Sequence, residues 1–292
     1  MKTIIDKISR FTRNSHCGIG NFDGIHRGHQ EIVRTLKKLA GPAGKTGIIT
    51  FIPLPFSVLK KAPHLYLTPR KEKEKIFQNL GVDFIYYFKF TRRFSMISPQ
   101  EFVNLIATKI GPCSVVVGEN FHFGKGRGGN AQKLKELARN LFSVIILPRV
   151  QDEGPISSTR IRELLLLGHL SAANRLLGRE YEVCGTVIKG KGKGRRLGFP
   201  TINISPPREK LLPLEGVYKV RVMVGKKEFL GAMFCRTDII EVHLINFRGN
   251  LYRKKVAIRF IERLRDIESF PDDESLHTAI ARDIARIKDK GT

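Results

Sequence analysis

Two histidines lie close together in the segment GIGNFDGIHRGHQEIV, residues 18–33. An apolar strand ending near Gly20 is followed by a turn, by His26, Gly28 and His29, and then by an amphipathic helix. The N–H groups at a helix N-terminus favour anions, a glycine lets an anion approach the backbone, and imidazoles add donors. The segment therefore predicts a phosphate-binding site. It has neither the lysine of a P-loop nor the G-x-G-x-x-G spacing, which disfavours a Walker-type kinase and a dinucleotide fold.

Two further segments of the first half could contact a nucleotide. Ser157, Ser158, Thr159 and Arg162 open a predicted helix, where hydroxyls can cap the first turn and Arg162 projects toward the same end. Asn120 follows another apolar strand and has aromatic neighbours that suit a purine or an isoalloxazine ring. Alone, the first segment is more typical of an ordinary helix cap, and the second is a weak signal.

A glycine-rich basic stretch, GKGKGRRLGFPTIN, covers residues 190–203. Successive backbone N–H groups in such a loop can surround a polyphosphate, and the lysines and arginines between the glycines add positive charge. Without the GFPT-x-N that ends the stretch, a solvated basic turn between strands would explain it equally well.

Elements that could position these residues alternate through the first half as short apolar strands and amphipathic helices. The predicted strands are 47–52, 84–88, 114–117 and 143–147, and the predicted helices are 30–40, 70–80, 99–109 and 132–140. This alternation predicts an α/β domain, a parallel sheet with helices on both faces. Ligands of such sheets bind beyond the carboxyl ends of the strands where the strand order reverses, so the loops after the first strand and after Val117 are expected to hold the site.

The second half has a different pattern. Two helices, 158–168 and 171–177, precede short alternating strands at 182–188, 217–224, 229–233, 240–247 and 255–260, and a helix at 273–288 ends the pattern. This order predicts a small antiparallel β-barrel with a terminal helix. We place the domain boundary near 180–184, which gives domains 1–180 and 181–292.

The composition limits the class of protein. A length of 292 residues suits two domains, and 41% hydrophobic residues suit a folded core. Lys and Arg number 52 against 27 Asp and Glu, a net charge of +25, so polyanionic partners must be considered. Both halves are basic, however, and no detachable cationic tail stands out; a solvated basic surface is the simpler explanation.

Compartment and metal content are indicated by the cysteines and the N-terminal segment. The four cysteines are far apart and form no C-x-x-C pair, which predicts neither a zinc site nor a disulfide framework. Charges interrupt the N-terminal MKTIIDKISRF, and no apolar run approaches the ~20 residues of a membrane span. We therefore expect a cytoplasmic protein.

The motifs taken together resemble a known family, the prokaryotic bifunctional riboflavin kinase/FMN adenylyltransferases (FAD synthetases). The adenylyltransferase motifs are Gly20-Asn21-Phe22-Asp23-Gly24-x-His26-x-Gly28-His29, Val117-Gly118-x-Asn120-Phe121-x-Phe123-Gly124 and Ile156-Ser157-Ser158-Thr159-x-x-Arg162. The riboflavin kinase motifs are residues 190–203, Glu215-Gly216-Val217-Tyr218, Glu241-Val242-His243-Leu244 and Asn250-Leu251-Tyr252. The resemblance covers nearly the whole chain and implies a Rossmann-like nucleotidyltransferase domain followed by a β-barrel kinase domain.

For the first domain, the resemblance implies attack of the FMN phosphate on the α-phosphate of ATP, which forms FAD and pyrophosphate. His26 and His29 would be catalytic, donating to charge that develops on the phosphates, with the help of Mg²⁺. Asn120 would contact the flavin or the nucleotide. The implied ATP-binding residues are Gly20, Phe22, Asp23, His26, Gly28, His29, Ser157, Ser158, Thr159 and Arg162.

For the second domain, the resemblance implies phosphorylation of riboflavin to FMN, with Glu241 as the base that accepts the ribityl hydroxyl proton. Thr201 and Asn203 alternate along an extended segment, so their side chains share one face and can offer oxygens to Mg²⁺ carried by ATP. The implied ATP-binding residues are Gly190, Gly192, Gly194, Arg195, Gly198, Pro200, Thr201 and Asn203.

The expected partners are therefore the small molecules riboflavin, FMN and ATP; no nucleic acid, membrane or obligate protein partner is expected. One alternative is an FMN adenylyltransferase whose kinase domain is impaired, because the segment FLGAMFCRTDIIEVH around Glu241 lacks the Pro-Thr motif usual in the family. A second alternative, permitted by the net charge of +25, is a nucleic-acid-binding protein on a relic nucleotidyltransferase fold.

Overall fold

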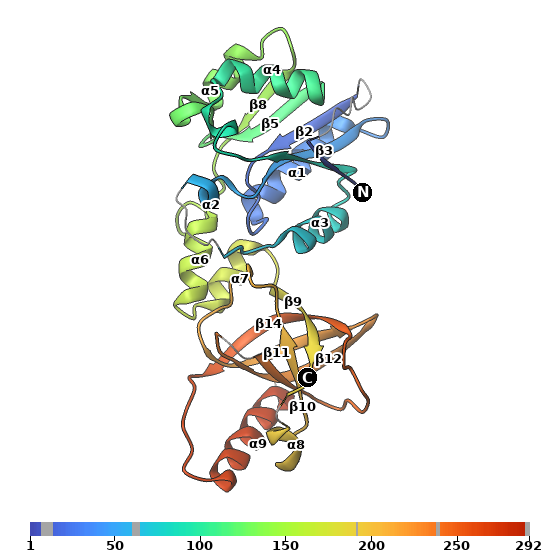
Figure 1. The fold of residues 1–292 in the computed structure, drawn as a ribbon, viewed down its shortest axis with the longest axis vertical. Coiled ribbons are helices and arrows are strands. Elements are labelled where there is room, and N and C mark those ends of the chain that lie inside the picture. Colours follow the sequence, from blue (N-terminus) through green and yellow to red (C-terminus); the bar gives the residue numbers. More distant parts are fainter. Residues whose placement is uncertain (7–13, 60–64, 191, 238–239, 290–292) are drawn as a thin grey trace. The chain divides into compact units, whose positions relative to one another are not determined.

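The computed structural model describes residues 1–6, 14–59, 65–190, 192–237 and 240–289 (Figure 1). Lys191 of the glycine-rich stretch and residues 238–239 before Glu241 lie outside the described residues. The chain forms two compact units, Met1–Ser158 and Thr159–Thr292, and each is treated separately below. The helices at 158–166 and 170–177 thus fall almost wholly in the second unit, and a functional boundary at residue 180 stays a prediction.

A parallel sheet of six strands forms the first unit, in the order β1-β4-β3-β2-β5-β8. The strands are β1 (Lys2–Ile5), β2 (Ser15–Ile19), β3 (Lys45–Ile52), β4 (Phe84–Lys89), β5 (Ser114–Gly118) and β8 (Ser143–Leu147). From β2 the chain first moves to β3 on one side and later to β5 on the other, so the strand order reverses between β2 and β5. The predicted fold class is confirmed, and the loops after β2 and β5 leave the sheet side by side at this reversal.

Helices cover both faces of this sheet (Figure 1). On one face lie α1 (Arg27–Ala40) and α3 (Arg70–Asn79), whose Leu36 and Phe77 are fully buried against the strands. On the other face lie α4 (Pro99–Lys109) and α5 (Ala131–Leu137). The unit also contains α2 (Pro55–Leu59), η1 (Phe94–Met96), β6 (His122–Phe123), η2 (Lys125–Arg127) and β7 (Gly129–Asn130).

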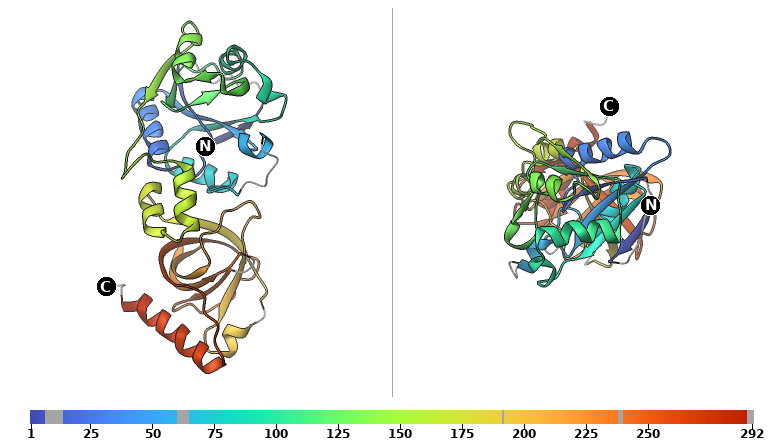
Figure 2. Two further views of the ribbon diagram at one scale, coloured as in Figure 1. Left: turned by 90° about the vertical axis from the view of Figure 1, so that its left-hand side faces the viewer. Right: turned by 90° about the horizontal axis from the view of Figure 1, so that it is seen from above.

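The second unit is a closed antiparallel barrel, as predicted, and its strand order is β10-β13-β12-β11-β14-β9 (Figure 2). The strands are β9 (Tyr181–Ile188), β10 (Thr201–Ser205), β11 (Gly216–Val224), β12 (Lys227–Cys235), β13 (Ile240–Leu244) and β14 (Lys255–Arg265). The helices are α6 (Ser158–Leu166), α7 (Leu170–Leu177), α8 (Lys193–Arg196) and α9 (Asp273–Asp289). Ile284 and Ile287 of α9 pack against Leu230 and Phe234 of β12, which fixes the terminal helix on the barrel.

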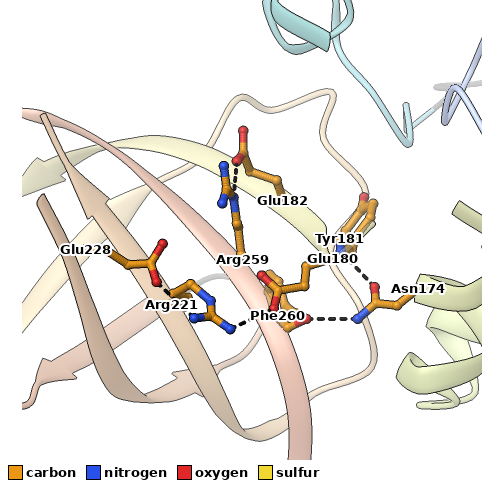
Figure 3. A network of polar contacts seen from close by, with 8 residues as sticks. All are labelled: Asn174, Glu180, Tyr181, Glu182, Arg221, Glu228, Arg259 and Phe260. Carbon is orange, nitrogen blue, oxygen red and sulfur yellow. Dashed lines mark hydrogen bonds and ion pairs between the residues drawn. The ribbon is translucent and has the colours of Figure 1, made fainter. Parts of the chain in front are cut away.

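Asn174 joins α7 to the barrel through both ends of its side-chain amide (Figure 3). Its Oδ1 accepts from the backbone N–H of Tyr181 at 2.7 Å, and its Nδ2 donates to the carbonyl of Phe260 at 3.0 Å. Two ion-paired arginines lie beside it on the barrel wall: Arg221 contacts Glu180 and Glu228, and Arg259 contacts Glu182. Asn174 thus satisfies polar groups at the start of β9 and within β14.

We expect Asn174→Ala to lower the free energy of unfolding of the second unit by about 2–4 kcal/mol, because it leaves one backbone donor and one backbone acceptor without their partner. Urea titration of the full chain measures the shift. Ser171→Ala, on the exposed side of the same helix, is the matched control and should change the value by less than about 0.5 kcal/mol. Equal effects of the two substitutions would contradict this role of Asn174.

Candidate active sites

The loop after β2 has an unusual backbone. Phe22 and Ile25 have positive φ angles of 49° and 44°, a region that bulky side chains rarely adopt, and Gly24 has a φ of 86°. Both bulky side chains are fully buried, so the core holds them in place. A backbone of this kind persists where the surrounding structure enforces it, and it is common at ligand sites.

Two histidine rings lie together at the N-terminus of α1. The rings of His26 and His29 stack with their centroids 3.7 Å apart and an interplanar angle of 18°. A Cβ on Gly28 would lie 3.2 Å from Nδ1 of His26, so the glycine leaves the space in which the His26 ring folds over the helix start. Two imidazoles at the N-terminus of a helix form the kind of donor set that the sequence predicts for phosphate.

The start of this helix differs from the predicted one. Helix α1 begins at Arg27 with His26 as its N-cap, so Gly28 and His29 lie in the first turn and not before the helix. The prediction of a start at residue 30 was wrong because these first-turn residues are not apolar and carry no helical periodicity. The shift places His29 on the helix itself, which fixes its backbone.

Three hydrogen bonds hold the loop at Asp23. The Asp23 carboxylate accepts from the N–H of Thr68 at 3.0 Å, and the Gly24 N–H donates to Thr68 Oγ1 at 3.0 Å. Ser158 Oγ donates to the Asp23 carbonyl at 2.7 Å, so this hydroxyl anchors the loop. The roles predicted for Ser157, Thr159 and Arg162 stay predictions, since the last two belong to the second unit.

Lys73 on α3 is a buried residue that sequence analysis missed. Its Nζ donates to the carbonyl of Asn21 at 2.8 Å. Burial lowers the pKa of Lys73 to about 8, and the negative charge of Asp23 opposes that shift. Lys73 precedes Phe77 by one helical turn, so its position on the apolar stripe of the helix was a usable signal.

The pKa of Lys73 makes the stability of the first unit depend on pH. With a folded-state pKa of about 8, below the unfolded value, the unfolded state holds this proton more strongly, so stability rises as the pH rises from about 8 to about 10.4. The stability difference between the wild type and Lys73→Met should therefore increase by about 3 kcal/mol over this interval. Urea titrations at the two ends measure it, and Lys71→Met, exposed on the same helix, should give a flat difference.

Asn120 lies at the other loop of the strand-order reversal. It follows β5, which pairs with β2, and a Cβ on Gly118 would lie 3.1 Å from its Oδ1. The glycine thus lets the amide fold back over the end of its own strand. The rings of Phe121 and Phe123 stack with centroids 5.5 Å apart, but Phe123 is buried and both rings pack in the core of this unit, so their stacking alone does not indicate a ligand site.

The second unit brings the predicted kinase residues onto one face of the barrel. In the antiparallel pair β10–β13, Asn203 lies opposite Glu241, and Thr201 lies opposite His243. Directly opposed residues of neighbouring strands point to the same face, so all four side chains share it. They are half-buried, whereas Val242 between them is fully buried in the barrel. The Glu241 carboxylate thus lies on the same face as the uncharged side-chain oxygens of Thr201 and Asn203.

Two glycines of the basic stretch let the backbone approach these side chains closely. A Cβ on Gly190 would lie 2.0 Å from Nδ2 of Asn203, and one on Gly194 would lie 2.5 Å from the Phe199 carbonyl and 3.2 Å from Oγ1 of Thr201. Two neutral oxygens held in this way fit Mg²⁺ that arrives with most of its ligands from ATP. Among the described residues, no group of three His, Cys, Asp or Glu could hold a metal by itself.

The other residues predicted to bind ATP in this unit shape the loop or line it. Gly192 and Gly198 have φ angles of 74° and 79°, which favour glycine at both positions. Arg195 lies exposed on α8, a single helical turn within the predicted loop. The Pro200 carbonyl is bonded to Nδ1 of His243 at 3.0 Å, a contact that links the loop end to β13.

Gly190→Ala should impair the kinase far more than it destabilises the barrel, because the new methyl group displaces only the end of the Asn203 side chain. We expect the KM for Mg-ATP in FMN formation to rise by about 10-fold, which corresponds to roughly one lost polar contact. Lys226→Ala, at an exposed position of the turn between β11 and β12, is the control and should leave the KM unchanged. An unchanged KM in Gly190→Ala would exclude a role of Asn203 in binding Mg-ATP.

Aromatic residues beside this face escaped the sequence analysis. The Phe199 ring lies 5.7 Å from that of His243, edge to face, and 4.9 Å from that of His277 on α9. Phe199 therefore links the loop, the β13 strand and the terminal helix. Its place between Gly198 and Pro200 was the available signal, but which surface it contacts depends on how the barrel closes.

Comparison with known proteins gives a separate family description for each half of the chain. A family model described as FAD synthetase matches residues 8–160, and one described as riboflavin kinase matches residues 177–290. The bifunctional riboflavin kinase/FMN adenylyltransferase of Buchnera aphidicola (subspecies Schizaphis graminum) is 35% identical, with 97% of this chain and 96% of that one covered. The protein of the same name from Listeria monocytogenes is also 35% identical, with 92% and 90% covered.

A solved structure matches the whole chain. It is titled a macrolide-efflux protein from Streptococcus pneumoniae, is 28% identical, and has a TM-score of 0.88 with 99% of both chains covered. In the part of this chain that the structure describes, no helix is long and apolar enough to cross a membrane. With two matching family models and relatives of 35% identity along its length, the chain belongs to the bifunctional riboflavin kinase/FMN adenylyltransferase family.

Proposed function

We propose that this protein makes FAD from riboflavin in two ATP-dependent steps at two separate sites. The barrel phosphorylates riboflavin to FMN, and the parallel-sheet domain transfers AMP from ATP to FMN. The observation that carries this proposal is the presence of one phosphate-binding arrangement in each unit. One is the His26–His29 pair at the start of α1, and the other is the face that Thr201, Asn203 and Glu241 share.

In the adenylyltransferase step, an oxygen of the FMN phosphate attacks the α-phosphorus of ATP, and the bond to the bridging oxygen breaks to release pyrophosphate. Such a transfer needs positioned donors more than a covalent nucleophile. His26 and His29 donate to the charge that grows on the phosphates, together with the N-terminus of α1. Asn120 contacts FMN or the nucleotide, while Ser157, Ser158, Thr159 and Arg162 hold the triphosphate, Arg162 as a fixed cation.

In the kinase step, Glu241 accepts the proton of the ribityl 5′-hydroxyl as its oxygen attacks the γ-phosphorus of ATP, and ADP leaves. The glycine-rich loop from Gly190 to Gly198 surrounds the phosphates with backbone N–H groups. Mg²⁺, held by Thr201 and Asn203 with the ATP phosphates, would supply charge neutralisation. The proposal is supported by the β10–β13 face, which Thr201, Asn203 and Glu241 share, and by Gly190 and Gly194, which lie against Asn203 and Thr201.

The functional domains proposed here are 1–180 and 181–292, with riboflavin, FMN and ATP as the ligands. Chemistry that uses free nucleotides and flavins suits the cytoplasm, and none of the four cysteines, all within the described residues, forms a disulfide. Arg162 and the basic residues of the loop around Arg195 would account for part of the excess positive charge, whereas Lys73, Lys210 and Lys219 are buried.

The test is to supply the two substrates separately to the purified full chain. With ATP and Mg²⁺, riboflavin should yield FMN and then FAD, and FMN alone should yield FAD and pyrophosphate, both followed by chromatography. Failure to make FAD from FMN would refute the adenylyltransferase assignment. FAD formation without consumption of riboflavin would instead support a monofunctional enzyme with an impaired kinase domain.

A further inference from the structure

A buried cation lies beneath the phosphate-binding loop of the first unit and takes no part in either proposed reaction. We propose that Lys73 is a positioning residue of the adenylyltransferase, whose ammonium holds the Asn21 carbonyl so that the turn from Asn21 to Ile25 presents His26 and His29 to ATP. The inference rests on the adenylyl transfer proposed above. Lys73 contacts the loop and none of the reacting groups.

The turn needs such support because its backbone is strained. Phe22 and Ile25 both adopt left-handed angles, and each such residue costs about 1–3 kcal/mol unless its surroundings enforce the conformation. Buried side chains hold these residues from one side, and hydrogen bonds hold the peptide groups between them. The segment from Thr68 to Lys73 supplies several of these bonds, since Thr68 binds the Asp23 carboxylate and the Gly24 N–H.

Lys73 holds the first peptide group of the turn. The Asn21 carbonyl accepts from Lys73 Nζ at 2.8 Å and from Thr50 Oγ1 at 3.2 Å, so two donors from different elements converge on one oxygen. The shorter bond comes from the charged donor, and hydrogen bonds from charged groups are the stronger ones. At the other end of the turn, Gln30 Nε2 donates to the Ile25 carbonyl at 2.9 Å. The turn is thus held at both ends before His26 begins.

Burying a lysine to bind a carbonyl costs free energy of folding. This cost indicates that the contact serves the site and not only stability. Lys73 is 3% exposed, and a charge in such a place is unfavourable unless it is compensated. The carboxylate of Asp23, in the same loop, provides that compensation. The ammonium therefore donates to the carbonyl that opens the turn and is favoured there by the charge of the acid at its centre.

Loss of the Lys73 donor should let the turn relax and move the imidazoles relative to ATP. We expect Lys73→Met to lower kcat for FAD formation from FMN by about 10–100-fold, the range associated with a displacement of ~1 Å in a reacting geometry. The KM for ATP should rise about 3-fold or more, since the displaced loop also binds ATP, while the KM for FMN stays unchanged. A merely structural loss would reduce the amount of folded enzyme and leave both KM values as they were.

Thr50→Val provides the second variant, because it removes the other donor to the same carbonyl with little change in shape. It should lower kcat by about 3–10-fold with the same selective rise in KM for ATP, and its effect should be non-additive with Lys73→Met because the two donors share one acceptor. If Lys73→Met does not fold, the Thr50→Val result alone decides whether the hydrogen bonds to the Asn21 carbonyl position the two histidines. Lys71→Met, exposed on α3, is the control and should behave as wild type.

The experiment uses the full chain, and FMN formation from riboflavin serves as an internal standard that these variants should leave unchanged. A kcat within about 2-fold of wild type in both Lys73→Met and Thr50→Val, or a loss of kcat with unaltered KM for ATP, would overturn the positioning role. A wild-type chain that makes no FAD from FMN would instead refute the proposed function, and this is measured before any variant is compared.

Discussion

Replacing Glu241 by Gln is expected to lower kcat for riboflavin phosphorylation by about 10²–10⁴-fold, the contribution typical of a general base. Glutamine keeps the shape of the side chain and its half-buried place opposite Asn203 but cannot accept the ribityl proton. The KM for ATP should change little, because Thr201, Asn203 and the glycine-rich loop remain. Initial rates of FMN formation with saturating Mg-ATP measure the effect.

The same protein contains the controls for this variant. FAD formation from added FMN takes place in the other unit and should proceed at the wild-type rate, which shows that the chain is folded and that ATP is accepted there. Glu209→Gln, at an exposed position of the barrel unit, should leave both activities unchanged. Should Glu241→Gln phosphorylate riboflavin as fast as wild type, Glu241 would be at most a structural strand residue.

The fold was largely predictable because its periodicities are local. Alternation of apolar strands with amphipathic helices indicated the parallel sheet, and the change to short strands after residue 181 indicated the barrel. The expectation that the loops after the first strand and after Val117 meet at one site needed only the rule for strand-order reversal, and β2 pairs with β5 accordingly. Element ends were less certain, as the early start of α1 at Arg27 shows.

Contacts within the sites were beyond sequence analysis because they depend on strand register and close backbone approach. Nothing local to Asn203 and Glu241 indicates that they face each other across β10 and β13, since only barrel closure sets that register. The need for glycine at 190 likewise follows from where the Asn203 amide lies. As a charged residue type, Lys73 was expected on the surface. Only its spacing of one helical turn from Phe77 indicated that it is buried.

His29→Ala is expected to lower FAD formation from FMN and ATP by about 10²–10³-fold, as loss of one donor to developing charge does in other transfer enzymes. His29 lies in the first turn of α1, its ring stacked on His26 and 5.0 Å from the Phe22 ring. Removing it takes away a donor and a wall of the space that holds His26, so both imidazoles are affected. Most of the loss should appear in kcat, because the donor acts on charge that grows in the transition state.

The readout for His29→Ala is the fate of FMN in a reaction started from riboflavin. The barrel should still phosphorylate riboflavin at the wild-type rate, so FMN accumulates where the wild type proceeds to FAD. His16→Ala makes the same change at the opposite end of β2, where His16 binds Ser114 Oγ, and should leave FAD formation within about 2-fold of wild type. Near-normal FAD formation by His29→Ala would mean that the helix N-terminus and His26 suffice for the transfer, and the catalytic assignment would then rest on them alone.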